Sequence, residues 1–371
     1  MKNLALRSMI LLLAGALGFT ACENAFYDGP KEKESILPDQ VMVEIPSSLS
    51  ADASLYKSAA AVDTLKGREI YGHLRFFIHS GQLAAHVTRG VIHVLRDYHI
   101  DKVLTLSYVS DDDGRVKNLV VLEAPDFEGR TWEYGLTITD ADSEGEADGG
   151  KAMQVFWNHR YPAEVITMIK PYNLDRSNDK HWSQAMYRID YSGAGEMGYD
   201  RHMVVSIADL PEVEPLLAPF AMNAMKLFVG AKDGIVDVYG NTAHPNAKFL
   251  SEKVGYNWAF VASADDGEDI AVVELGLPRN SIDTDDRVVL LEENSIYNVL
   301  YNEVMTVWPN SSQELVAAWL ANTEAPGFFN SRGFIQGGEA PSNLYLPLVD
   351  RIQLLTPFNP AQISALEINF Q

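Results

Sequence analysis

The sequence predicts an α+β fold: a large antiparallel β-sheet, closed as a barrel or packed as a sandwich, with an N-terminal helical segment and C-terminal helices. Three observations predict it. Helical periodicity precedes residue 100, about eleven short runs rich in β-branched and aromatic residues fill residues 101–278, and helical periodicity returns near residue 296. The 371 residues are 47% hydrophobic, which is enough apolar material for one large domain or two ordinary ones.

Residues 49–100 form the predicted helical segment. In its second half Leu83, Val87, Val91 and Leu95 recur every three or four residues. At about 100° per residue this spacing places them on one apolar stripe. We therefore expect the segment to pack on the sheet.

Turn sequences such as Asp113-Gly114 and Asp266-Gly267 separate the β runs of residues 101–278. Connections this short do not hold crossover helices, so the strands should pair in antiparallel fashion. So many strands exceed what a flat open sheet accommodates comfortably, and this favours a barrel, a sandwich or a strongly curled sheet.

Residues 279–371 mix both kinds of pattern and are expected to belong to the same domain as the sheet. Apolar spacing predicts a helix over 296–308, and the capping box Ser311-Ser312-Gln313-Glu314 predicts a second helix after it. A Gly-rich aromatic loop over 326–341 and strands over 351–355 and 363–370 complete the expectation.

The first 21 residues have the organisation of a secretory signal peptide. Lys2 and Arg7 precede or flank an apolar run of roughly eleven residues, shorter than the ~20 that a membrane-spanning helix needs. The sequence Phe19-Thr20-Ala21-Cys22 resembles the lipobox of bacterial lipoproteins, with Phe19 where that family usually has Leu.

The resemblance to bacterial lipoproteins implies cleavage before Cys22 and acylation of Cys22, for example with palmitate. It also implies that this lipid anchor holds the protein in the bacterial cell envelope, on the periplasmic or cell-surface side of a membrane. Residues 22–48 are polar and contain Pro30, Pro38 and Pro46, and we expect them to form a flexible tether. The resemblance carries no enzymatic activity with it.

Charge and cysteine content exclude two classes of protein. The chain has 51 acidic against 29 basic residues and a net charge of −22, so it lacks the cationic surface that grips nucleic acid. Its single cysteine excludes a scaffold held by internal disulfides.

Trp157, Asn158, His159 and Arg160, together with Trp182, combine flat apolar rings with planar hydrogen-bonding groups. Such a mixture suits a sugar or another polar ring, because the ring face stacks while donors fix its edge. The alternative is a strand whose Trp lies in the core and whose polar neighbours end in a turn.

Asp140, Asp142 and Glu144 are spaced like the oxygen ligands of an EF-hand loop and are the candidate calcium ligands. Lys151 stands where that loop has its bidentate Glu, so a solvated acidic hairpin tip is the alternative. No other cofactor is expected.

Three functions follow. The preferred one is a membrane-anchored envelope lipoprotein that acts as a ligand-binding or assembly module, with a glycan or apolar ligand held near some of its tryptophans: Trp132, Trp157, Trp182 and Trp258. The second is a hydrolase of envelope or extracellular polymers, which needs for instance two carboxylates ~5–9.5 Å apart. The third is a structural or adhesive component with calcium-bound loops. Standard catalytic motifs are mostly absent from the sequence, which favours binding over catalysis.

Overall fold

The computed structural model describes residues 36–50, 67–97, 103–159, 163–211 and 220–371. They divide into two compact units. The first unit comprises Met1–Met42, Leu83–Gly198 and Ile368–Gln371, and the second comprises Val43–Gln82 and Tyr199–Glu367. Helix α2 (Gly67–Asp97) is the predicted N-terminal helix, and its residues are divided between the two units.

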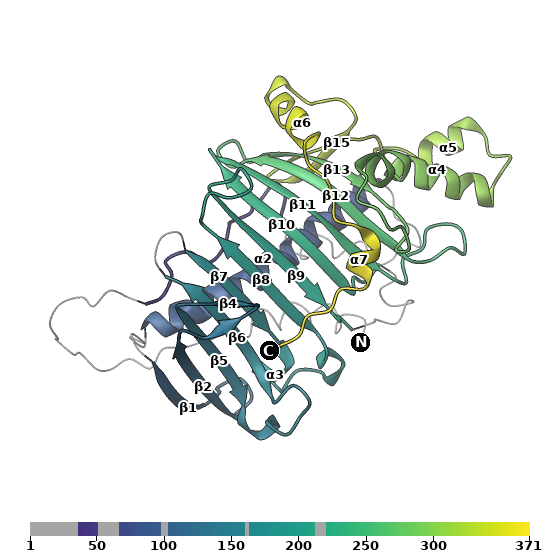
Figure 1. Ribbon diagram of the computed structural model, residues 1–371. Helices are drawn as coiled ribbons and strands as arrows, with labels where there is room; N and C mark the ends of the chain where they lie inside the picture. Colours follow the sequence, from purple (N-terminus) through teal and green to yellow (C-terminus); the bar gives the residue numbers. More distant parts are fainter. Residues whose placement is uncertain (1–35, 51–66, 98–102, 160–162, 212–219) are drawn as a thin grey trace. The chain divides into compact units, whose positions relative to one another are not determined.

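The first unit holds six strands of the large sheet, and each pairs in antiparallel fashion with the next in the order β1-β2-β5-β6-β7-β8 (Figure 1). A two-stranded ribbon, β3 with β4, lies between β2 and β5 in sequence. The elements are β1 (Leu104–Val109), β2 (Val116–Glu123), β3 (Asp126–Phe127), β4 (Arg130–Thr131), β5 (Tyr134–Asp140), η2 (Ala141–Ser143), β6 (Lys151–Asn158), β7 (Glu164–Ile169), α3 (Pro171–Leu174), η3 (Lys180–Trp182) and β8 (Met186–Ser192).

The second unit holds seven further strands, antiparallel in the order β9-β10-β11-β12-β13-β14-β15, with most of the C-terminal helices. The elements are β9 (Arg201–Ala208), β10 (Ala224–Lys232), β11 (Ile235–His244), β12 (Tyr256–Asp265), β13 (Ile270–Gly276), η4 (Val288–Glu293), α4 (Ile296–Val307), α5 (Gln313–Trp319), β14 (Gly327–Asn330), β15 (Gly333–Gly337), η5 (Asn343–Tyr345), α6 (Leu346–Ile352) and α7 (Pro360–Ser364).

Both faces of the strands in the second unit are covered. On one face, α2 places Phe77 5.9 Å from Trp258 of β12 and stacks Tyr71 4.9 Å from Phe334 of β15. On the other face, η5 and α6 pack against β12 to β14 in a core cluster that includes Ala259, Val261, Val272, Phe328, Tyr345, Leu348 and Ile352. Strands buried on both faces read as continuous apolar runs, as β12 does.

The predicted fold class is confirmed: the structure is α+β, its large sheet is antiparallel, and helices lie before and after it in the chain. All eleven strands predicted between residues 101 and 278 are present within a few residues of their expected bounds. The sheet is not a closed barrel, since among the described strands β1 pairs only with β2 and β15 only with β14.

Three predictions for the C-terminal part are wrong. Residues predicted as a Gly-rich loop contain β14 and β15, because Phe328 and Phe329 fill the two faces of the sheet. Residues 351–355 and 363–370 form no strand. Leu348, Ile352 and Leu355 are spaced four and three residues apart, which is a helical spacing, and all three pack in the core cluster.

The two C-terminal helices predicted first are both present. Helix α4 begins after Ser295, whose side chain accepts a hydrogen bond from the Asn298 N–H, and α5 begins after Ser312, whose side chain accepts one from the Leu315 N–H. Among the described residues, no helix combines the length and the apolar character needed to cross a membrane.

Two histidines lie where α2 packs on the strands of the second unit: His73 belongs to α2 and His244 to β11. His244 is fully buried; its Nδ1 lies 3.0 Å from the Phe220 carbonyl oxygen and its Nε2 lies 2.7 Å from Thr242 Oγ1. A carbonyl oxygen only accepts, so Nδ1 carries the proton and Nε2 accepts from the Thr242 hydroxyl. Burial lowers the pKa of His73 to about 4 and that of His244 to about 3.

We expect the stability of the protein to fall as the pH drops from 7 to 5. Below the ordinary pKa of 6.5 the unfolded chain binds protons at His73 and His244 that the folded chain excludes, so protonation favours unfolding. The free energy of unfolding should fall by about 2 kcal/mol for each histidine over this range. Urea unfolding at pH 7, 6 and 5 measures it, and His73→Gln should lessen the slope. A wild-type stability independent of pH over this range contradicts the assignment.

Candidate functional site

The residues predicted to bind a ligand near the end of β6 do not form an open surface. Trp157 has 0% exposure, and its indole Nε1 donates to the Ile36 carbonyl oxygen at 2.7 Å. Asn158 donates to Glu164 Oε2 at 3.0 Å, and His159 Nδ1 lies 2.7 Å from Glu133 Oε2. The indole therefore stabilises the core, and its neighbours are held by two glutamates.

The remaining predicted ligand-binding residues are dispersed. Trp182 is partly exposed and comes from the separate element η3, whereas Arg160 lies outside the described residues. Trp132 and Trp258, the other two tryptophans expected near a ligand, are both buried. Ligand binding by these residues stays a prediction, and the buried indoles do not support it.

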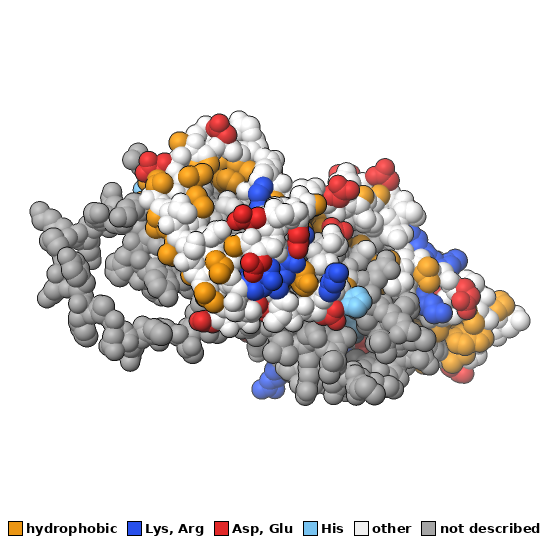
Figure 2. All heavy atoms as spheres, turned by 90° about the horizontal axis from the view of Figure 1, so that it is seen from below, with side chains coloured by type: hydrophobic (Ala, Val, Ile, Leu, Met, Phe, Trp, Pro, Cys, Tyr) orange, Lys and Arg blue, Asp and Glu red, His pale blue; other side chains and the backbone are white. Residues whose placement is uncertain are grey.

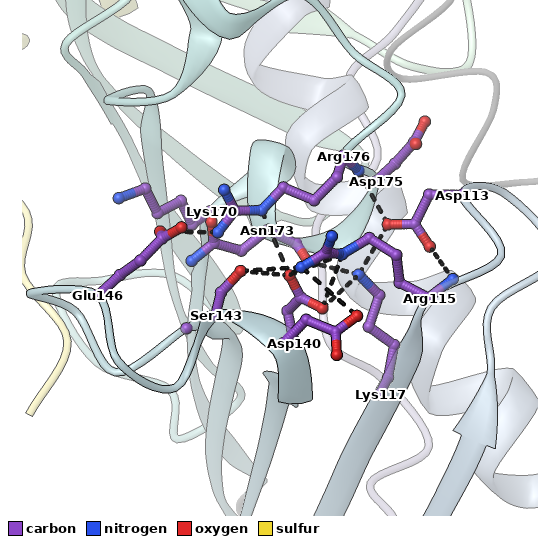
Figure 3. A network of polar contacts seen from close by, with 12 residues as sticks. Asp113, Arg115, Lys117, Asp140, Ser143, Glu146, Lys170, Asn173, Asp175 and Arg176 are labelled. Carbon is purple, nitrogen blue, oxygen red and sulfur yellow. Dashed lines mark hydrogen bonds and ion pairs between the residues drawn. The ribbon is translucent and has the colours of Figure 1, made fainter.

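The candidate calcium ligand Asp140 lies inside a network of ion pairs instead (Figure 3). Its carboxylate has 0% exposure and accepts hydrogen bonds from Arg115 Nη2 at 2.8 Å and from Ser143 Oγ at 2.6 Å. Lys117 Nζ and Arg176 Nε lie 3.7 Å and 3.4 Å from it. Three cationic side chains thus surround the carboxylate, and together they would repel a calcium ion.

The other two candidate calcium ligands lie at the border of this network. Asp142 is exposed, 3.8 Å from Arg115 Nη2, and Glu144 Oε1 accepts from Asn118 Nδ2 at 3.0 Å. In the described part of the chain, no three His, Cys, Asp or Glu side chains are arranged to hold a metal ion. Calcium binding in this loop therefore stays a prediction.

The same network joins the hairpin turn between β1 and β2 to the loop before β6 and to the segment that follows β7. The ammonium group of Lys117 is buried and contacts Asp113 Oδ2 at 2.8 Å and the Asn173 carbonyl oxygen at 2.9 Å. Lys170 pairs with Asp148 at 2.6 Å. Figure 3 shows these side chains converging from several loops, which indicates a structural role.

Ionisation of the buried carboxylates depends on these contacts. Burial opposes ionisation of Asp140, but hydrogen bonds from Arg115 and Ser143 and the charge of Lys117 hold its pKa below its usual range. The pKa of Asp113 is lowered in the same way: the N–H of Arg176 and the ammonium of Lys117 outweigh burial. Both groups therefore stabilise the fold when they are ionised.

The exposed large hydrophobic side chains offer a different candidate site, on α4 and the turn that follows it. Tyr297, Tyr301 and Trp308 are 41%, 39% and 42% exposed. A step of four residues at about 100° each places Tyr297 and Tyr301 on one side of the helix axis, and Trp308 is the first residue after the helix. The rings of Tyr297 and Tyr301 are nearly parallel, with their centroids 6.1 Å apart. We call these three rings the aromatic face of α4.

A hollow of about 390 Å³ lies at the end of this face, at the turn between α4 and α5. It combines apolar side chains with an amide and a hydroxyl group. It is lined by Val307, Trp308, Pro309, Asn310, Ser311 and Leu315. The hollow is largely open to solvent, so it would cover only part of a ligand.

The outer side of α4 is free of charged residues because its single charged residue points inward. Glu303 is buried and accepts hydrogen bonds from Ser251 N and Oγ at 2.7 Å and 2.9 Å and from the Tyr256 hydroxyl at 2.9 Å. Burial opposes its ionisation, but these hydrogen bonds lower its pKa. Glu303 therefore holds α4 on the strands.

The predicted helix over 296–308 includes Val307 and Trp308, which are 38% and 42% exposed. The sequence contains a signal for this exposed face that the prediction did not use: Tyr297 and Tyr301 lie outside the apolar stripe. That stripe consists of Ile296, Val299, Leu300 and Val304. On the face that Figure 2 shows, several acidic and basic side chains lie side by side.

Comparisons with known proteins yield no relative. No protein-family model matches the chain, and neither the curated proteins nor the solved structures include a match. Function must therefore be argued from the residues of this chain.

We expect Asp140→Asn to destabilise the first unit by about 3–5 kcal/mol, because it leaves buried cations without their carboxylate. Asp142→Asn is the matched control: the same chemical change at an exposed position should shift the free energy of unfolding by less than about 0.5 kcal/mol. Urea unfolding of both variants measures the difference. Equal stabilities would show that the network contributes nothing.

Proposed function

We propose that this protein is a membrane-anchored envelope lipoprotein that binds a neutral glycan through the aromatic face of α4. The observation that carries the proposal is the exposure of Tyr297 and Tyr301 on one side of α4 and of Trp308 at its C-terminal end, while the outer side of this helix has no charge. Exposed aromatic rings grouped in this way mark interaction sites.

The chemistry of this surface fits a sugar better than a purely apolar ligand. The C–H faces of a sugar ring stack on aromatic rings, while its hydroxyl groups need donors and acceptors at the rim. The Asn310 amide and the Ser311 hydroxyl line the hollow beside Trp308 and supply such groups. Ser311 donates its proton to the Trp308 carbonyl oxygen at 2.8 Å, so its oxygen is oriented to accept.

Charge selects the class of glycan. The chain has a net charge of −22, and the outer side of α4 offers no cation to an acidic sugar. An anionic polymer would therefore be repelled by the long-range field with no local compensation. A neutral glycan avoids this repulsion.

The anchor in this proposal is Cys22, which lies outside the described residues. Acyl chains on Cys22 would hold the protein at a membrane, and residues 23–35 would let the acidic body stand off from anionic headgroups. The rest of the expected tether, residues 36–48, packs in the body instead, where Ile36, Leu37 and Val43 are buried. A glycan-binding surface at a distance from the bilayer suits capture of envelope or extracellular polymers.

We expect Trp308→Ala to weaken glycan binding at least about tenfold, since covering one aromatic side chain contributes about 1.5–3 kcal/mol. Native affinity electrophoresis through gels that contain neutral polysaccharides (a β-glucan, a mannan, a xylan or an α-glucan) measures binding by retardation. Leu354→Ala removes an 84%-exposed apolar side chain outside the aromatic face and is the control, which should be retarded as the wild type is. Absence of retardation on all four polymers, or unchanged retardation of Trp308→Ala, refutes the glycan site.

We expect Cys22→Ala to abolish incorporation of labelled palmitate and to move the protein from the membrane fraction to the soluble fraction. Acylation requires the thiol, and no other cysteine is present. Labelling in cells followed by fractionation tests this, with Ser47→Ala as a variant that keeps the thiol. Label that persists in the Cys22→Ala protein contradicts the anchor.

A further inference from the structure

The second group of exposed large hydrophobic side chains lies on the hairpin of β1 and β2. Leu106 is 45% exposed and Val109 62% exposed, and Val103, Val116 and Leu122 are exposed beside them. Strand β1 is the outermost strand of the first unit (Figure 1), and among the described strands it pairs only with β2. Its second edge therefore presents backbone groups that pair with no strand of the described part of the chain.

Nothing in β1 protects this edge against another strand. Residues 103–110, Val-Leu-Thr-Leu-Ser-Tyr-Val-Ser, contain no charge, no Pro and no Gly, and the pairing with β2 has no bulge. The opposite case is β15, which is only five residues long, has Gly at both ends and pairs with β14 through an irregular register. Short strands, bulges and charges are the usual protections of sheet edges, so β1 has the character of a strand that is paired.

The direction of the backbone groups of β1 follows from the hairpin. The Ser110 N–H donates to the Arg115 carbonyl oxygen at 2.8 Å, so Ser110 and the even-numbered residues before it turn their N–H and C=O groups toward β2. The odd-numbered residues Thr105, Ser107 and Val109 then turn theirs to the outer edge.

We propose that β1 pairs with β1 of a second copy of this chain, in antiparallel fashion, about a two-fold axis through Leu106. This inference is independent of the proposed glycan site. A two-fold axis perpendicular to the sheet keeps the two faces of the sheet in register across the junction. Thr105 then lies opposite Ser107 and Val103 opposite Val109, and these odd-numbered residues are those whose backbone groups point outward.

A second copy fits this edge because the strand is complementary to itself in that register. On one face Leu104 lies opposite Tyr108 and Leu106 lies opposite Leu106, so apolar side chains meet apolar ones. On the other face two hydroxyl-bearing residues meet, Thr105 and Ser107. Matched cross-strand pairs of this kind each contribute about 0.2–1 kcal/mol.

A register shifted to centre on Ser107 loses this match. It places Thr105 opposite Val109 and Leu104 opposite Ser110, so that hydroxyl groups face apolar side chains.

The absence of charge within 103–110 matters equally, because two copies with a net charge of −22 each would repel one another at any acidic surface.

Disulfide trapping in cells tests the pairing and its register. In the proposed dimer Leu106 faces its own copy as a non-hydrogen-bonded pair, with Cα atoms about 4.5 Å apart, within the range that a disulfide bridges. Mild oxidation of membranes that carry Leu106→Cys should convert most of the protein to a disulfide dimer on a non-reducing gel. Leu104→Cys is the matched control, because its Cα would lie four residues away from its counterpart, on the order of 13 Å.

Leu106→Lys places two like charges at the axis, and the fraction of the wild-type full chain that sediments as a dimer in detergent should fall at least tenfold in the variant. Because Leu106 is half-exposed, a melting curve like that of the wild type should show that the variant still folds. The proposal is overturned if Leu106→Cys is not trapped, if the Leu104→Cys or Ser107→Cys variant is trapped instead, or if Leu106→Cys is trapped on a different protein. Unchanged glycan binding by the Lys variant separates this surface from α4.

Discussion

The structure of the second unit depends on the close packing of α2 against its strands. At Gly81 an added Cβ would lie 2.8 Å from side-chain atoms of both Leu227 and Met225, so the helix touches β10 without an intervening side chain. At Gly327 an added Cβ would lie 2.7 Å from the Tyr71 ring. Small residues at these two points let the aromatic rings around them fill the remaining space, and interiors packed at this density tolerate little change in volume. With η5 and α6 on the opposite face, the central strands lose contact with water on both sides.

A different principle governs the loops of the first unit, where the chain buries charge. Asp140, Asp113 and Lys117 are almost inaccessible to solvent, yet each has partners of opposite charge within hydrogen-bonding distance. Such a network links the turns more specifically than apolar contacts do, because each donor fits one acceptor geometry. It also explains how an acidic loop that resembles a calcium site in sequence acts through arginine and lysine side chains in the structure.

The uncharged surfaces are notable against this acidic background. The chain has a net charge of −22, yet the outer side of α4 and the edge of β1 expose apolar or aromatic side chains. Strand β1 contains no carboxylate, and the single carboxylate of α4, Glu303, is buried. Acidic residues elsewhere keep copies of the protein soluble and apart. We propose that contacts form at the two surfaces that lack charge: a glycan at the aromatic face of α4 and a second strand at the edge of β1.

Short runs rich in β-branched and aromatic residues, and the turn sequences between them, by themselves determined eleven of the strands and their antiparallel pairing, because these signals are local. The sequence also determined the helix that follows Ser295, whose cap is a local hydrogen bond. Only the tertiary structure decided that Trp157 lies in the core while Trp308 is half-exposed, that Asp140 meets Arg115, and that β1 rather than another apolar strand lies at the edge. These outcomes depend on contacts between residues far apart in the chain, and the residue types alone do not specify which side of an element is covered.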